Sequence, residues 1–195
     1  MTLVRRRSLL TGVVLGLIVG GVATYAISRS GHHELDARLR GTIDTAGGNP
    51  GLSQDDDAGK PLPDLRFAGF DGGTIMLSAR RGRPLVINLW SSTCAPCVKE
   101  MPDIERVHQQ MKDRVAFLGV DTADPSRTDA AAMAKKTGVT YDLALDENGD
   151  LAQALGVVNL PTTVLVDAGG RIVTSKAGAL DEAHLSALIA KSFPE

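Results

Sequence analysis

The sequence predicts an α/β fold in which helices flank a central mixed β-sheet, preceded by an N-terminal transmembrane helix. Two short apolar runs, 86–90 and 115–120, lack the length of helices and suit strands buried on both faces of a sheet. Between them, 98–111 carries apolar residues at spacings of three and four, which is typical of a helix with one buried face. Because strand and helix alternate, right-handed crossovers and a parallel core are expected.

The remaining elements follow from turn and capping signals. A second helix is expected over 129–137. Apolar runs at 163–166 and 171–173 flank a glycine-containing turn and predict an antiparallel hairpin. The last helix should begin near Asp181, because an acidic side chain suits a first turn. The segment 72–77 suggests a small additional strand pair ahead of the core.

The N-terminal region contains an uncharged, apolar segment over residues 9–27. Its nineteen residues rise about 28 Å as a helix, close to the bilayer's hydrocarbon thickness of about 30 Å. Residues 1–8 hold three arginines, whereas only Arg29 follows closely, so residues 1–8 are expected in the cytoplasm and the rest outside. The predicted location is therefore the cell membrane, single-pass. A cleaved signal peptide, which would make the protein secreted, remains the alternative.

Residues 28–60 hold glycines and an acidic run, with hardly a large apolar side chain. Such a segment buries too little surface to offset its ordering entropy, so a flexible linker is expected. Residues 61–195 then form one domain that is long enough for a full core. The formal net charge of −2 gives no argument for nucleic acid as a partner.

The chain's only two cysteines, Cys94 and Cys97, form a Cys-x-x-Cys motif between the first strand and the first helix. A protein that keeps two cysteines at this spacing typically uses them together in redox chemistry. A purely structural disulfide is the alternative, but so short a loop removes little entropy from the unfolded chain. At the start of a helix, free N–H groups and the helix dipole would stabilise a Cys94 thiolate, the attacking form.

Several motifs occur in an order that resembles the thioredoxin superfamily. More narrowly, they are similar to the membrane-anchored TlpA/ResA-like thiol-disulfide oxidoreductases, over about residues 61–193. The motifs are Asn88-Leu89-Trp90, Cys94-Ala95-Pro96-Cys97-Val98-Lys99-Glu100-Met101-Pro102 and Leu160-Pro161-Thr162-Thr163. The resemblance implies a thioredoxin-like fold and an enzyme that exchanges thiols and disulfides through Cys94 and Cys97, without a cofactor or metal ion.

The resemblance also assigns roles to individual residues. Cys94 would attack a substrate disulfide, and Cys97 would resolve the mixed disulfide. The buried aspartate of ordinary thioredoxins is replaced by Asn88, which cannot exchange a proton near neutral pH. Glu100, three residues after Cys97, matches the acidic residue of TlpA/ResA-type proteins and is the expected proton acceptor.

Three further residues are candidate contacts for a substrate. Trp90 directly precedes the motif and is expected on the apolar rim of the site. By resemblance, a cis peptide bond joins Leu160 to Pro161 and faces the disulfide, where it would expose backbone to an extended peptide. His108 falls on the apolar face of its helix and is expected to be packed, and His184 is expected on the surface.

The expected function is an extracytoplasmic reductase of disulfides in exported proteins, similar to the proteins that reduce apocytochrome c before haem attachment. Since the extracytoplasmic compartment is oxidising, a membrane protein must relay electrons from the cytoplasm to such a reductase. Two alternatives stay open. The protein could run in the other direction, as an oxidant that installs disulfides, or it could be a copper-binding module for oxidase assembly, because two thiolates suit Cu(I).

Overall fold

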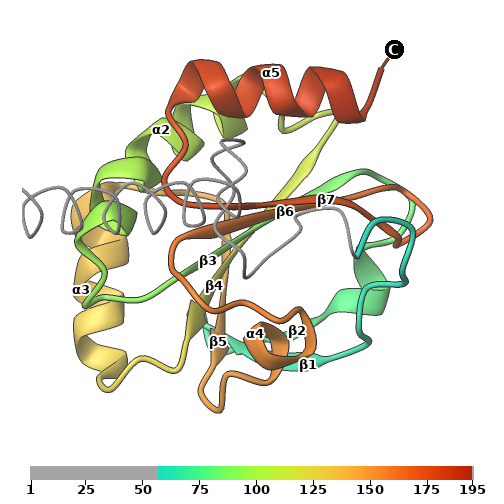
Figure 1. Cartoon of the computed structure of the whole chain (residues 1–195). Coiled ribbons are helices and arrows are strands. Elements are labelled where there is room, and N and C mark those ends of the chain that lie inside the picture. The colour runs from blue at the N-terminus through green and yellow to red at the C-terminus, as the bar shows by residue number, and fades with distance from the viewer. Residues whose placement is uncertain (1–56, 195) are drawn as a thin grey trace, which may run out of the picture. The chain divides into compact units, whose positions relative to one another are not determined.

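The computed structural model describes residues 57–194. Its centre is one seven-stranded mixed sheet in the order β2-β1-β5-β4-β3-β6-β7 (Figure 1). Strand β4 pairs in parallel with β3 and with β5, and the remaining pairs are antiparallel, which confirms the expected mixed sheet with a parallel core. The strands are β1 (Arg66–Gly69), β2 (Thr74–Met76), β3 (Leu85–Trp90), β4 (Ala116–Thr122), β5 (Asp142–Asp146), β6 (Thr162–Val166) and β7 (Ile172–Ala177).

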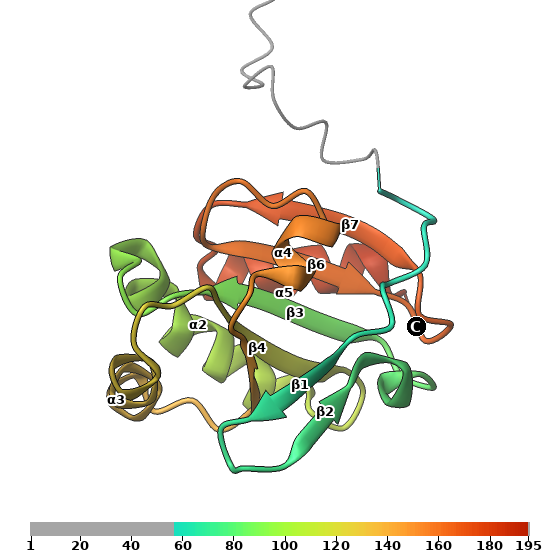
Figure 2. The same cartoon turned by 90° about the horizontal axis from the view of Figure 1, so that it is seen from below.

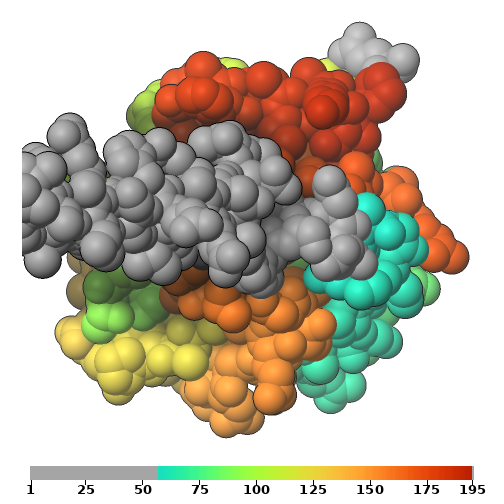
Figure 3. Space-filling view, viewed as in Figure 1, coloured from blue at the N-terminus to red at the C-terminus, as the bar shows by residue number. Residues whose placement is uncertain are grey.

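The helices lie on both faces of the sheet. The helical elements are the 3-10 helix η1 (Leu77–Arg80) and the α-helices α2 (Ala95–Met111), α3 (Arg127–Thr137), α4 (Asp150–Ala154) and α5 (Glu182–Ser192). Helix α2 packs against α3 and α5 on one face, and α4 lies on the opposite face (Figures 1 and 2). In the space-filling view, α5 runs along the top of the domain and α3 lies below it (Figure 3).

Strand β3 positions the cysteine motif. The strand is buried along its whole length, which is why a nearly uninterrupted apolar run encodes it. Because successive side chains point to opposite faces, Ile87 joins the core beneath α4, whereas Val86 joins Ile104 in the core beneath α2 and α5. The strand ends at Trp90, and α2 begins at Ala95. The cysteines therefore lie at the end of a strand that is buried in the middle of the sheet.

Capping side chains explain where the other long helices begin. Ser126 caps α3 by accepting a hydrogen bond from the Asp129 N–H at 3.2 Å, and Asp181 caps α5 by accepting one from the His184 N–H at 2.9 Å. Helix α3 ends at Gly138, whose φ of 72° lies in the left-handed region that glycine adopts readily. The predicted helices at both places are confirmed, as are the hairpin of β6 with β7 and the small strand pair of β1 with β2.

Strand β5 was missed by the pattern of apolar residues. Its sequence, Asp142-Leu143-Ala144-Leu145-Asp146, begins and ends with an acid and contains no long apolar run. Asp142 is exposed and forms an ion pair with Arg80, so it needs no burial. Asp146 is buried, but it accepts hydrogen bonds from the first backbone N–H groups of α4. In the sequence, the two terminal acids argue against a strand. In the folded protein, tertiary contacts give both of them partners.

The described chain joins the sheet at Gly59, whose N–H donates to the Ile172 carbonyl at 2.8 Å. The Ile172 N–H in turn donates to the Lys60 carbonyl at 2.9 Å, just ahead of the expected domain start at residue 61. Within residues 57–194, no helix has the length and apolar character needed to cross a membrane. The predicted transmembrane segment, 9–27, lies outside the described residues, as does the predicted linker before residue 57.

Candidate active site

The candidate active site is built on the turn between β3 and α2. Cys94 is the N-cap residue of α2, and its Sγ accepts a hydrogen bond from the Cys97 N–H at 3.3 Å. The two cysteines form a disulfide, with their Cα atoms 5.3 Å apart. Pro96 lies in the first turn, where its missing N–H costs no intrahelical bond. Cys97 is 0% exposed, whereas Cys94 is partly exposed, so Cys94 carries the sulfur that a protein partner can reach.

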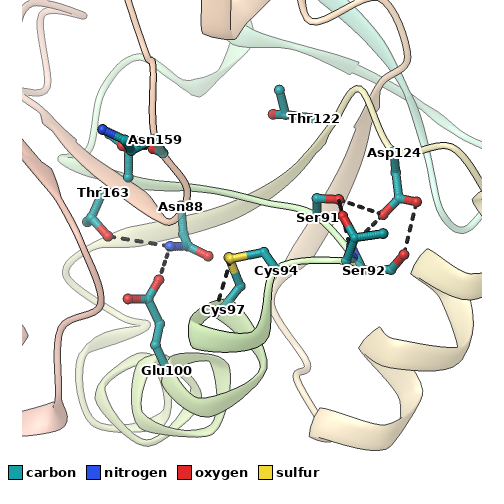
Figure 4. Close-up of a disulfide and its surroundings, with 12 residues drawn as sticks. Asn88, Ser91, Ser92, Cys94, Cys97, Glu100, Thr122, Asp124, Asn159 and Thr163 are labelled. Atoms are coloured by element: carbon teal, nitrogen blue, oxygen red, sulfur yellow. Dashed lines mark hydrogen bonds between the residues drawn. A yellow bond between two sulfur atoms is a disulfide. The ribbon is translucent and has the colours of Figure 1, made fainter.

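Glu100 lies one turn further along α2 and is only 2% exposed. Its carboxylate accepts a hydrogen bond from the Asn88 amide (Figure 4). It accepts a second one, at 2.8 Å, from the backbone N–H of Leu180. Burial raises the pKa of Glu100 from 4.5 to about 7, and the hydrogen bonds from Leu180 and Asn88 oppose this rise. A carboxyl group with a pKa near neutrality can both take and release a proton under physiological conditions.

Asn88 lies between Glu100 and the disulfide (Figure 4). Its Nδ2 donates to Glu100 and, at 3.4 Å, to the Thr163 hydroxyl, whereas its buried Oδ1 has no hydrogen-bond partner among the described residues. An amide cannot take up a proton near neutral pH, so Glu100 is the titratable group of this cluster. Thr163 was named in the sequence only as part of the motif 160–163, and Leu180 was not named at all. They reach the cluster from strand β6 and from the segment before α5, respectively.

The peptide bond between Leu160 and Pro161 is cis, which confirms the expected isomer. Pro161 is buried, and Leu160 packs against the cluster that contains Trp90, Cys97 and Met101. Val158, shortly before the cis bond, is 68% exposed, a high value for a large apolar residue. Its position in a loop without periodicity gave no signal in the sequence. These residues place an apolar segment of the chain beside the cysteine motif.

Trp90 does not lie on the rim of the site, and the expectation that it would is wrong. Its side chain is 0% exposed and packs against the ring of Phe70, with 6.1 Å between the ring centroids. Gly119 on the neighbouring strand leaves room for the indole, because a Cβ atom there would lie 3.1 Å from Trp90 Nε1. Trp90 therefore supports the cysteine motif from within the core.

A second group of polar residues lies on the other side of the disulfide and was not anticipated (Figure 4). Asp124, which follows β4, accepts hydrogen bonds from Ser91 and Ser92 in the turn before Cys94. Burial works against the charged form, but bonds from the backbone N–H groups of Ser92 and Ser126 and from serine hydroxyls lower the pKa of Asp124. The strand order could have indicated this contact, because β3 and β4 are parallel and the residues that follow them lie at the same edge of the sheet.

The two histidines in the described part of the chain lie away from the cysteine motif. His108 packs against Phe117 and Tyr141, with ring centroids at 5.3 and 5.7 Å, as expected for a core histidine. His184 is exposed, as expected, and its Nδ1 lies 2.7 Å from an Asp181 oxygen. Among residues 57–194, no group of three or more His, Cys, Asp or Glu side chains is arranged to hold a metal ion.

Comparisons with known proteins agree with this geometry. The thiol-disulfide oxidoreductase ResA of Bacillus thuringiensis is 27% identical over 139 residues, which cover 71% of this chain and 80% of that protein. A crystal structure of a DsbF homologue from Corynebacterium diphtheriae has a TM-score of 0.65 at 26% identity and covers 76% of this chain and 97% of that chain. A thiol-disulfide oxidoreductase from Bacteroides fragilis has a TM-score of 0.59 at 26% identity, over 66% of this chain and 97% of that one.

A family model described as Redoxin matches residues 57–189, nearly the whole described domain. The match includes both cysteines, Glu100 and the cis Leu160–Pro161 bond. The solved structures share their fold with this chain, a thioredoxin-like α/β fold with a central mixed sheet and flanking helices. The chain therefore belongs to the Redoxin family, as a ResA/TlpA-like thiol-disulfide oxidoreductase of the thioredoxin superfamily.

Proposed function

We propose that the protein is an extracytoplasmic, membrane-anchored reductase that breaks disulfides in exported proteins, such as apocytochrome c before haem attachment. The observation that carries the proposal is one arrangement on α2. The partly exposed sulfur of Cys94 lies at the helix N-terminus, the buried Cys97 is bonded to it, and the buried Glu100 follows on the same helix. This arrangement supplies a nucleophile, a resolving thiol and a proton acceptor in sequence.

In the reduced protein, Cys94 would react first. The backbone N–H of Cys97 that reaches the Cys94 sulfur, together with the helix dipole, stabilises a thiolate at the N-cap. The thiolate attacks one sulfur of the substrate disulfide, forming a bond between Cys94 and the substrate and releasing the other substrate sulfur as a thiolate. Water or substrate groups protonate that leaving thiolate.

Cys97 would then complete the reduction. It loses its proton and attacks the Cys94 sulfur, which releases the second substrate thiolate and forms the Cys94–Cys97 disulfide. Two electrons have then passed from the dithiol to the substrate. Because Cys97 is buried, its proton needs a nearby acceptor, and Glu100 on the same face of α2 has a pKa near neutrality, raised by burial to about 7.

The substrate would bind beside the cis bond. Leu160 packs on the same cluster as the partly exposed Cys94, and the exposed Val158, two residues earlier, would add apolar surface for a substrate. Pro161 joins this segment to β6 through the cis bond. Backbone pairing with an extended peptide at this position would give affinity without strict sequence selection. Trp90, being fully buried, would contribute by supporting the motif rather than by touching the substrate.

Location and electron supply complete the proposal. Residues 9–27 would anchor the chain in the cell membrane, with residues 1–8 in the cytoplasm and the linker, 28–60, carrying the domain on the outside. An oxidising compartment does not regenerate a dithiol, so a membrane protein would deliver electrons to the Cys94–Cys97 disulfide. The partners are thus exported proteins with disulfides and one membrane electron relay.

Trapping tests this function. In Cys97→Ala, the first attack is retained but resolution is lost, so the reduced variant is expected to accumulate a mixed disulfide through Cys94. A suitable probe is an oxidised peptide with a Cys-x-x-Cys-His motif, the type of sequence that receives c-type haem. The adduct is measured by intact mass, and it is expected to form with the disulfide form of the peptide and to be absent with its dithiol form.

Two results would count against the reductase. The first is that the reduced Cys97→Ala variant forms no adduct with the oxidised peptide. It would then not differ from Cys94→Ser, the matched control that lacks the nucleophile. The second is a reduction potential as high as that of strong disulfide donors, about −120 mV, which would favour the disulfide-forming direction.

A further inference from the structure

The Asp124 carboxylate accepts four hydrogen bonds. One carboxylate oxygen accepts from the backbone N–H of Ser92 and, at 3.1 Å, from the Ser91 hydroxyl. The other accepts from the Ser92 hydroxyl at 2.9 Å and from the Ser126 N–H at 3.0 Å. The carboxylate thus holds two segments, the turn before Cys94, which Figure 4 shows, and the start of α3.

The turn that Asp124 holds leads directly to the reactive sulfur. The Ser91 carbonyl accepts from the Cys94 N–H at 3.0 Å, which closes the turn and sets Cys94 at the N-cap of α2. Within the turn, the Ser91 hydroxyl lies 3.1 Å from the Thr93 hydroxyl. The placement of the Cys94 sulfur against the Cys97 N–H therefore depends on a turn whose two serines are both bound to one carboxylate.

The position of Asp124 is itself fixed by its surroundings. The preceding residue, Ala123, has a φ of 48°, in the left-handed region that residues other than glycine rarely adopt. The Ala123 N–H donates to the Asp146 carbonyl at 2.9 Å, which ties this bend to β5. Backbone conformations of this kind persist where the surrounding structure enforces them, and they cluster at functional sites.

Asp124 is the charged member of a pair of neighbouring acids, and Asp121 is the other member. Asp121 is 3% exposed, and its Oδ1 has no hydrogen-bond partner among the described residues. Burial raises the pKa of Asp121 from 3.8 to about 8, and the carboxylates of Asp124 and Asp146 add to the rise. Asp121 therefore holds a proton more readily than Asp124, and the serines donate to a charged Asp124 carboxylate.

We propose that Asp124 is a positioning residue for Cys94, which holds the Ser91–Ser92 turn so that the Cys94 sulfur stays against the N-terminus of α2. The proposal rests on the proposed function of Cys94 as the nucleophile. It differs from a purely electrostatic role, because a negative charge near Cys94 by itself would disfavour the thiolate. If Asp124 positions the turn, removing its side chain raises the pKa of Cys94 and slows its reaction. If Asp124 acted only through its charge, the same change would lower the pKa and speed the reaction.

The test compares thiol reactivity in the full-length reduced protein. Alkylation of Cys94 by iodoacetamide is followed from pH 5 to pH 9, which gives the thiolate pKa, and mass spectrometry confirms the modified residue. In Asp124→Ala, the alkylation rate at pH 6.5 is expected to fall about fivefold, with the pKa of Cys94 raised by roughly 0.7. Asp124→Asn retains one acceptor oxygen and is expected to show a smaller change in the same direction.

Matched variants separate positioning from folding. Ser126→Ala removes the cap of α3 and lowers stability, but it leaves Ser91 and Ser92 untouched, so its alkylation rate is expected to match the wild type. Ser92→Ala should slow alkylation less than Asp124→Ala does, and it should add little when the two are combined, because both remove the same interaction. Urea unfolding of each variant records the stability change independently.

The proposal is overturned if Asp124→Ala reacts as fast as the wild type or faster, or if Ser126→Ala slows alkylation to the same extent. The wild-type rate is a separate measurement. A wild-type Cys94 that reacts no faster than free cysteine would contradict the proposed function, whereas the ratio between variant and wild type tests Asp124 alone.

Discussion

Cys94→Ser is expected to abolish turnover, lowering the rate of disulfide reduction at least about a thousandfold. A serine hydroxyl is not ionised near neutral pH, so it gains nothing from the helix N-terminus that stabilises a thiolate. The remaining thiol cannot replace Cys94, because Cys97 is 0% exposed. The measurement is reduction of a protein disulfide such as that of insulin, driven by a chemical reductant and followed by turbidity.

Cys97→Ser is the matched control, because it removes the other sulfur and retains the first attack. Once reduced and freed of added reductant, it is expected to give one burst of substrate thiol per protein molecule and then stop at the mixed disulfide. The assignment of nucleophile and resolving thiol would be wrong if Cys97→Ser showed no burst, or if Cys94→Ser showed one.

Glu100→Gln is expected to slow resolution of the mixed disulfide by about 100-fold at pH 7, without a comparable effect on the first attack. Glutamine has nearly the same shape and can still accept the Leu180 N–H, but it cannot take a proton from Cys97. Stopped-flow measurement of resolution against pH should show an inflection near pH 7 in the wild type, where Glu100 titrates, and none in the variant.

Glu105→Gln provides the control, since Glu105 lies on the same helix but bonds to Thr140 and Gln109 instead of the Asn88 cluster. Its pH profile of resolution is expected to match the wild type. An unchanged profile in Glu100→Gln, or an equal change in Glu105→Gln, would remove Glu100 as the proton acceptor.

Protein stability gives a second readout of the Glu100→Gln variant. Because the pKa of Glu100 is about 7 in the folded protein and 4.5 in the unfolded chain, the folded state binds the extra proton between these values. The free energy of unfolding therefore falls as pH rises from about 4.5 to 7, by up to about 3 kcal/mol. The raised pKa of Asp121 adds a further fall in the free energy of unfolding as pH rises, in the wild type and in Glu100→Gln alike. Urea unfolding of the oxidised proteins should thus show a shallower fall in Glu100→Gln than in the wild type.

The cysteine motif was predictable because its determinants are local. An apolar strand, two cysteines and Pro96 in a first turn are contiguous in the sequence, and they fix the position of Cys94 at the start of α2. The role of Glu100 was suggested by the resemblance to TlpA/ResA-type proteins, but its burial could not be predicted from the sequence. The backbone N–H that binds the buried carboxylate belongs to Leu180, 80 residues later in the chain.

The two main departures from the sequence-based predictions also have long-range causes. Trp90 was expected at the rim, but Gly119 on the neighbouring strand leaves room for the indole, which is buried in the core. Strand β5 was missed, because Arg80 and the start of α4 provide partners for its terminal acids. Asp124 joins the site through its place at the end of β4, which only strand order reveals.

The most direct test of the account is the pKa of Cys94 in the reduced wild-type protein, measured by ultraviolet absorbance of the thiolate against pH. The helix N-terminus and the Cys97 N–H predict a value clearly below that of free cysteine, under about 7.5 compared with about 8.5. A titration at or above about 8.5, with alkylation no faster than that of free cysteine, would contradict the proposal that the start of α2 activates this sulfur.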